Sequence, residues 1–120
     1  MKTPLRHRLR TPAHRQNPLA LLQNLLRADE TELAYLLNTN PRTVYRWLAD
    51  DVPTHYEPLQ RWQQLVDLAK ASLKEEAIGE WFHEPNRALQ GSIPIRLAAD
   101  PRGFQLVRDL LGNAAYGNPL

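Results

Sequence analysis

The stretch that decides the fold is Thr31 to Trp47, which reads T-E-L-A-Y-L-L-N-T-N-P-R-T-V-Y-R-W. Two short helical patterns flank the turn-rich residues 38–40, and Pro41 cannot continue a helix but readily begins one. Two helices joined by so tight a turn cross at a steep angle and need a small residue, here Ala34, where they approach. Apolar side chains for the wedge between them are Leu33, Leu37, Val44 and Trp47. The stretch predicts a helix-turn-helix.

Helix signals continue on both sides of this motif, and strand signals do not. Leucines at helical spacing predict a first helix over 18–27, and Asp29 caps a second helix that ends near Asn38. Asn38 holds the turn position usually given to glycine, because asparagine tolerates a left-handed backbone. A third helix runs from Pro41 to about Ala49. No segment alternates with period two, so the chain is predicted to be all-α.

The predicted geometry turns polar side chains outward at the start of the third helix. This first turn is the part of a helix-turn-helix that enters the major groove, and arginine bonds well to guanine and to phosphate. The candidate DNA-binding residues are Asn40, Arg42, Thr43, Tyr45 and Arg46. The alternative is a purely structural three-helix module, since any three-helix core can imitate the pattern.

A longer helical pattern begins near Glu57 or Pro58 and keeps its apolar spacing toward Trp81 and Phe82. Prolines at 85, 94 and 101 then mark further helix starts, with Ser92 as a cap, and Gly112 or Gly117 ends the last helix. We predict an N-terminal helix-turn-helix bundle joined by a long helix to a small helical C-terminal domain. The expected divisions are a flexible basic arm over 1–17, the helix-turn-helix region over 18–55, the connecting long helix over 56–77 and the C-terminal domain over 78–120.

Composition limits the class of protein. The chain has 120 residues, of which 42% are hydrophobic, enough to bury one core. It has no cysteine, which removes disulfides and thiol chemistry and suits a reducing cytosol. Its longest apolar stretch, Leu19 to Leu26, is broken by polar residues and is too short to span a membrane. We expect a cytoplasmic protein without a membrane segment.

Positive charge is concentrated at the amino terminus. The net charge is +2, but residues 1–17 hold five basic residues and no acid, which leaves ten bases against thirteen acids in the rest. This arm is either a disordered leader or a basic segment that lies along phosphates or in a minor groove.

Two parts of the chain resemble known families. Thr31 to Trp47 resembles the helix-turn-helix of Xre-type repressors. Residues 78–117 are similar to the toxin-binding domain of the Xre/MbcA/ParS antitoxins, in which a tryptophan precedes a short Pro-Asn helix, Leu-x-Gly, x-Pro and a helix ending at glycine. The matching residues are Trp81, Pro85, Asn86, Leu89, Gly91, Pro94, Leu97, Gly103, Val107, Leu111 and Gly117. Together the two resemblances cover residues 20–117.

The resemblance implies a function. In that family the partner is a RES-domain toxin that consumes NAD or transfers from it, and the terminal region of the antitoxin covers the active site of the toxin. The chain would be the antitoxin of a type II toxin-antitoxin system that occludes its toxin and represses its own operon on double-stranded DNA. The implied toxin-binding residues are Trp81, Pro85, Asn86, Tyr116, Gly117 and Leu120. We expect a homodimer, because one short recognition helix reads only a few base pairs.

The carboxyl-terminal residues 110–120 carry no charged side chain and several apolar ones. Such a terminus is poorly suited to remain free in water, so it either packs on its own domain or docks in a cleft of a partner. A stand-alone transcriptional regulator and a protein-interaction adaptor remain alternative functions.

An enzyme is not expected. The histidines have no metal-ligand spacing, the two serines have no activating partner, and no glycine-rich phosphate loop is present. The carboxylate stripe of Glu75, Glu76, Glu80 and Glu84 is either a solvated helix face or a surface for a basic partner. We expect no cofactor, no metal site and no small-molecule substrate.

Overall fold

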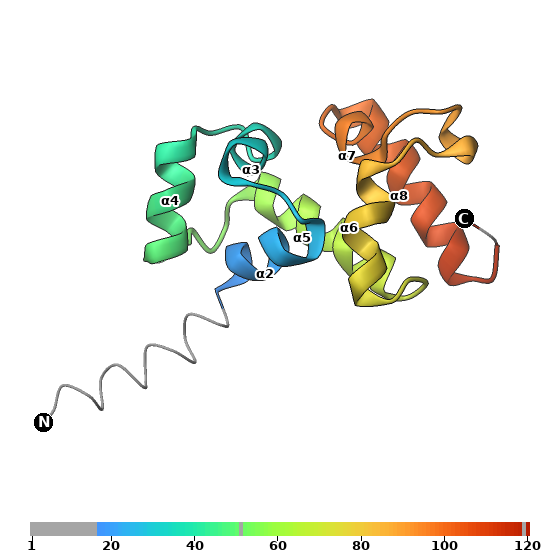
Figure 1. Ribbon diagram of the computed structural model, residues 1–120, viewed down its shortest axis with the longest axis horizontal. Helices are drawn as coiled ribbons and strands as arrows, with labels where there is room; N and C mark the ends of the chain where they lie inside the picture. Colours follow the sequence, from blue (N-terminus) through green and yellow to red (C-terminus); the bar gives the residue numbers. More distant parts are fainter. Residues whose placement is uncertain (1–16, 51, 119) are drawn as a thin grey trace, which may run out of the picture.

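The computed structural model describes residues 17–50, 52–118 and 120, which contain seven α-helices and one short 3-10 helix (Figure 1). The elements are α2 (Pro18–Leu26), α3 (Glu30–Leu36), α4 (Pro41–Ala49), α5 (Glu57–Lys70), α6 (Glu75–His83), η1 (Arg87–Leu89), α7 (Pro94–Leu97) and α8 (Pro101–Ala115). Within the described ranges no β-strand forms, apart from an isolated bridge between Asn86 and Ser92. The all-α prediction is confirmed. None of these helices has the length and apolarity needed to cross a membrane.

Prolines and polar caps set the helix starts. Pro41 and Pro101 begin α4 and α8, and the side chains of Asn40 and Asp100 accept hydrogen bonds from the first-turn amides. Pro18 begins α2, and Asn17 caps it in the same way. Asn17 was expected in the basic arm, but it is buried, and its side-chain amide donates to the carbonyl of Trp47, 3.1 Å away. Residues 1–16 of that arm lie outside the described residues.

The turn between α3 and α4 has the predicted left-handed residue. Asn38 has a φ of 57°, and the amide of Thr39 donates to the carbonyl of Ala34 at 2.9 Å, which closes the end of α3. Ala34 and Val44 are buried between the two helices, and Trp47 is half-buried. The two helices and the turn between them thus agree with the prediction from the sequence.

The prediction of one long helix over 56–77 is wrong, because α5 ends at Lys70 and α6 begins at Glu75. The chain leaves the helical path after α5, and α6 runs in a new direction (Figure 1). A continuous helix would place residues 62 and 82 about 30 Å apart at 1.5 Å per residue. Instead, the rings of Trp62 and Phe82 pack with their centroids 6.1 Å apart. The break thus lets α5 and α6 pack against each other in one core.

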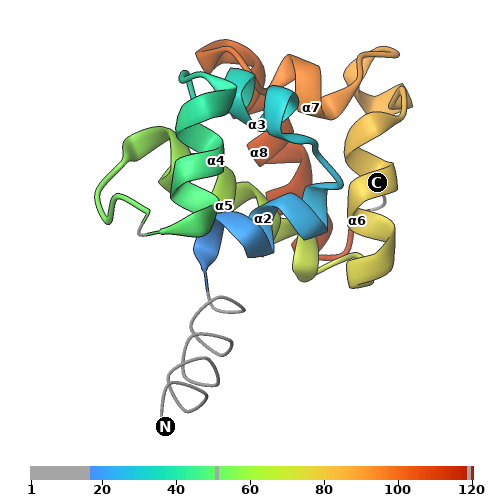
Figure 2. The same ribbon diagram turned by 60° about the vertical axis from the view of Figure 1, so that its left-hand side comes forward.

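Helix α2 joins the two parts of this core. It packs against both α5 and α6, and in Figure 2 α4 lies on one side of it and α6 on the other. Gly79 permits the close approach, since a β-carbon there would lie 2.7 Å from the side chain of Arg27. The largest fully buried side chains belong to Trp62, Phe82, Leu19, Leu26, Leu33, Leu37, Leu65, Ile78, Ile95, Leu111, Val44 and Val107.

Three details of the C-terminal part refine the predicted helix ends. Pro85 does not begin a helix, because Asn86 caps η1. Ser92 does not cap α7, since Ile93 occupies that position without a side-chain hydrogen bond. Of the two glycines predicted to end the last helix, Gly112 lies inside α8, and Gly117 follows it with a φ of 103°.

Candidate functional site

The outer face of α4 carries the predicted DNA-binding residues. Arg42, Tyr45 and Arg46 are exposed, and Thr43 is half-buried. Asn40 uses its side-chain oxygen to accept the amide of Thr43 at 2.9 Å, so it acts as the cap of α4. Neither arginine forms an ion pair within the described part of the chain. Among the helices in Figure 1, α4 lies at the left and α8 at the right.

Tyr56 holds the turn before this helix, a role that sequence reasoning missed. Its hydroxyl donates to the buried carbonyl of Leu37 and lies 3.4 Å from that of Asn38. Its ring meets the indole of Trp47 edge to face. Tyr56 comes directly before α5 and shows no local pattern, because its partners lie 18 and 19 residues earlier. The direction of α4 is therefore fixed from α5 as well as from α3.

The residues predicted to bind a toxin occupy two separate segments. Trp81, on α6, is half-buried and packs edge to face on Phe82 with centroids 5.0 Å apart. Pro85 is exposed just beyond α6. Tyr116 and Gly117 lie at the end of α8, where the side chain of Tyr116 is 91% exposed.

Asn86 supports a loop from a buried position. Its side-chain oxygen accepts the amide of Ala88 at 2.8 Å, and its carbonyl accepts the amide of Gly91 at 2.8 Å. Its own amide donates to the carbonyl of Ser92 at 3.0 Å. These bonds close the loop of residues 86–92, which connects α6 to α7.

The end of the chain packs in part on its own domain. Leu120 is half-buried against the core, and Leu111 is fully buried in it. Tyr116, between them, faces water. The terminus is thus anchored by its leucines and presents one aromatic side chain outward.

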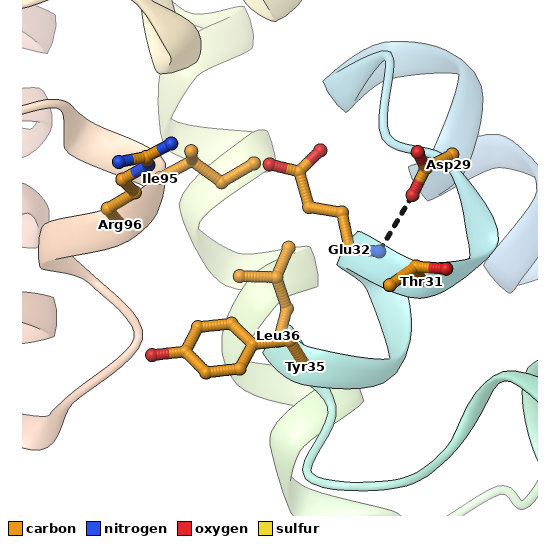
Figure 3. A pocket seen from close by; sticks show the side chains of 7 residues that line it. All are labelled: Asp29, Thr31, Glu32, Tyr35, Leu36, Ile95 and Arg96. Carbon is orange, nitrogen blue, oxygen red and sulfur yellow. Dashed lines mark hydrogen bonds between the residues drawn. The ribbon is translucent and has the colours of Figure 1, made fainter.

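A cleft of about 560 Å³ lies between α3 and α7 (Figure 3). Its lining residues are Asp29, Thr31, Glu32, Tyr35, Leu36, Ile95 and Arg96. Figure 3 shows the carboxylate of Glu32 directed across the cleft toward α7, while its amide donates to the side chain of Asp29 at 2.8 Å. Glu32 occupies the position of a capping-box carboxylate, but its side chain bonds to a residue of another helix, α6.

The hydrogen-bond partner of the Glu32 carboxylate is His83, at the end of α6. Its Nε2 lies 3.0 and 3.1 Å from the two carboxylate oxygens of Glu32, and its Nδ1 lies 2.9 Å from the carbonyl oxygen of Gly79. Burial alone lowers the pKa of His83, and the charge of Arg96 acts in the same direction. The bonds to Gly79 and Glu32 outweigh both, so the pKa of His83 lies above its ordinary value of 6.5.

No group of three or more metal-ligating side chains gathers among the residues that the structure describes. The polar groups that do converge, around His83 and around Asn86, hold elements together. The described residues thus form a small all-helical fold, in which the exposed residues among the predicted binding candidates lie on α4, just beyond α6 and at the end of α8.

Comparison with known proteins shows what the chain is similar to. Residues 65–117 match the family described as the Antitoxin Xre/MbcA/ParS C-terminal toxin-binding domain. A probable mycobacterial cidal antitoxin of Mycobacterium tuberculosis is 32% identical over 74 residues, which is 61% of this chain and 64% of that relative. The match thus spans just under two thirds of the relative's length. One chain of the crystal structure of the M. tuberculosis MbcT-MbcA toxin-antitoxin complex has the same fold, with a TM-score of 0.63 and 22% identity over 86% of this chain and 95% of that chain. The resemblance to Xre/MbcA-type antitoxins is confirmed.

Proposed function

We propose that the protein is the antitoxin of a type II toxin-antitoxin system, that it neutralises a RES-domain, NAD-consuming toxin by occlusion, and that it represses its own operon. The observation that carries the proposal is the match of residues 65–117 to a toxin-binding domain. The similar M. tuberculosis proteins, a probable antitoxin and a chain of a toxin-antitoxin complex, support it. The chain acts as a binding protein and not as an enzyme, with no cofactor.

The proposed contact with the toxin centres on Tyr116. An aromatic side chain that is 91% exposed on an anchored helix end can enter a cleft at little conformational cost. Trp81, Pro85, Gly117 and Leu120 are proposed to shape the surface around it. Asn86 would contribute by holding the loop that follows Pro85, since its polar groups are already bonded within that loop.

The proposed contact with DNA uses α3 and α4 as a helix-turn-helix. Arg42, Thr43, Tyr45 and Arg46 would reach base edges and phosphates, with Asn40 fixing the start of α4. A homodimer would place two such helices on successive turns of operator DNA. The division into a DNA-binding region over 18–55 and a toxin-binding domain over 78–120 is part of the same proposal.

Co-expression with a RES-domain toxin tests the proposal. We expect a stable complex on size exclusion, and growth that is protected from the toxin. Tyr116→Ala should weaken the complex and protection without changing the melting temperature, because the side chain makes little contact with its own fold. The matched control is Tyr45→Ala, an exposed tyrosine on α4, which should leave the complex intact.

Two results would favour the other functions. A chain that binds a promoter but forms no complex with the toxin is a stand-alone regulator. A chain that binds a protein partner but no duplex is an adaptor. Point variants serve better here than deletion of residues 116–120, since Leu120 packs on the core and its loss would disturb the fold.

A further inference from the structure

The bond between His83 and Glu32 joins helices that are distant in the sequence. The two residues are separated by 51 positions, and their side chains are 33% and 29% exposed. Glu32 lies on α3, in the proposed DNA-binding helix pair, and His83 is the last residue of α6. Helices α3 and α7 meet around an open cleft, so side-chain packing does not fill this edge of the molecule.

The two contacts of the His83 ring depend on which of its nitrogens carry a proton. The carbonyl oxygen of Gly79 can only accept, so Nδ1 of His83 must carry a proton to bond with it. The Glu32 carboxylate also only accepts while it is ionised, so Nε2 must carry a proton as well. Both contacts are therefore satisfied by the imidazolium cation alone. A neutral ring has one N–H and must give up one of them.

We propose that His83 and Glu32 form a proton-dependent latch, in which the imidazolium holds α3 against α6 and loss of its proton releases α3 at the edge of the cleft. The latch joins the helix pair α3 and α4 to the C-terminal helices. This proposal rests on contacts within the chain and does not depend on what α4 binds.

Charged groups act on the ring of His83 from more than one helix. Glu32 faces the ring from α3, and Arg96 acts on it from α7. From α2, Arg27 donates to the carbonyl of Glu76 at 3.3 Å, and this link between α2 and α6 does not depend on the proton of His83. From α5, the apolar side chain of Trp62 packs on Phe82, the residue before His83. Deprotonation therefore loosens α3, while α2 stays bonded to α6.

The sign of the effect follows from the direction of the shift. The pKa of His83 is raised in the folded state, so its contribution to stability is fully present below pH 6.5 and is lost as the pH rises through the folded pKa. Glu32 and Arg96 both line the cleft (Figure 3), so Arg96 can serve as an alternative charge partner for the released carboxylate.

Nuclear magnetic resonance of the full chain tests the latch. The His83 ring should titrate above 6.5, and Glu32→Gln should lower its midpoint, because the carboxylate that favours the cation is gone. Amide protection of α3, corrected for intrinsic exchange, should fall severalfold as the pH rises through that midpoint, while α5 serves as the internal reference. In Glu32→Gln the protection of α3 should no longer depend on pH.

Two further variants separate the latch from general destabilisation. Glu30→Gln removes another carboxylate of α3, one that accepts a hydrogen bond from Gln23. This variant should leave the titration of His83 unchanged. Arg96→Ala should move the midpoint to higher pH, since that guanidinium lowers the pKa. An unshifted His83 titration in Glu32→Gln, or α3 protection in the unmodified chain that stays constant across the titration, would overturn the proposal.

Discussion

The indole of Trp47 and the phenol of Tyr56 meet edge to face, with ring centroids 5.2 Å apart and planes inclined by 64°. Trp47 belongs to α4, and Tyr56 immediately precedes α5. The same tyrosine bonds the carbonyl of Leu37 at the end of α3. One side chain thus braces both helices of the pair from outside it, in a place that a helix-turn-helix pattern does not include.

Tyr56→Phe should lower the free energy of unfolding by about 1 kcal/mol, because the ring contact remains and only the hydroxyl bond to the Leu37 carbonyl is lost. Tyr56→Ala also removes the edge-to-face pair and should lower the free energy of unfolding by at least about 1 kcal/mol more than Tyr56→Phe does. Urea denaturation followed by tryptophan fluorescence measures both. Equal stabilities of the phenylalanine variant and the unmodified chain would show that the hydroxyl bond contributes nothing.

Gly103 and Gly112 offer a matched pair on α8. A β-carbon at Gly103 would overlap the backbone carbonyl of Leu97, whereas one at Gly112 would meet no atom within 4 Å. Gly103→Ala should therefore destabilise the protein by about 1–3 kcal/mol, since backbone must move. Gly112→Ala should stabilise it by up to about 1 kcal/mol, because alanine is the better helix former. Calorimetric melting temperatures that shift in the same direction would contradict this account of the corner between α7 and α8.

Asn86→Ala should cost about 1 kcal/mol of stability, because the amide of Ala88 loses its acceptor at the start of η1. Asn86→Ser keeps an uncharged oxygen that can cap η1 and should cost less. Thermal melts of the two variants separate the supporting role from a contact role. If both variants melt like the unmodified chain yet lose toxin binding, Asn86 touches the toxin directly.

Arg46→Ala should weaken binding to operator DNA about tenfold or more, the cost of losing a good arginine contact to a base or phosphate. If the contact is to phosphate, the dependence of the logarithm of affinity on the logarithm of salt concentration should also become shallower, by about 0.9. Arg102→Ala, an exposed arginine on α8, is the control and should bind as the unmodified chain does. Gel-shift titrations at several fixed salt concentrations give both values. Unchanged affinity for Arg46→Ala would remove α4 from the role of recognition helix.

Local chemistry made the helix starts and the turn predictable. Pro18, Pro41 and Pro101 open helices as expected, and Asn38 takes the left-handed backbone for which it was singled out. The break after Lys70 could not be found in this way, because residues 71–74 hold neither glycine nor proline and Leu73 continues the apolar spacing. What bends the chain there is the contact between Trp62 and Phe82, a distant pair that periodicity does not encode.

The site was predictable to a similar depth. Exposure of Arg42 and Arg46 follows from the helical phase of α4. The exposure of Tyr116 could not be predicted in this way, because apolar residues lie near it on both sides in the sequence. The roles of Tyr56 and of the pair His83 and Glu32 depend on contacts across 18 to 51 residues. Such contacts are decided by how whole helices pack, so no local pattern announces them.

The packing of α2 against both α5 and α6 limits how chains of this type can be recombined. A fragment that ended at residue 55 would leave buried leucines of α2 without the helices α5 and α6, and one that began at 56 would uncover the surface of α6 around Gly79, on which Arg27 packs. The two ends of the molecule should therefore unfold as one cooperative unit. A graft that transfers the helix pair α3 and α4 between relatives must carry α2 together with the surface of α6 that receives it.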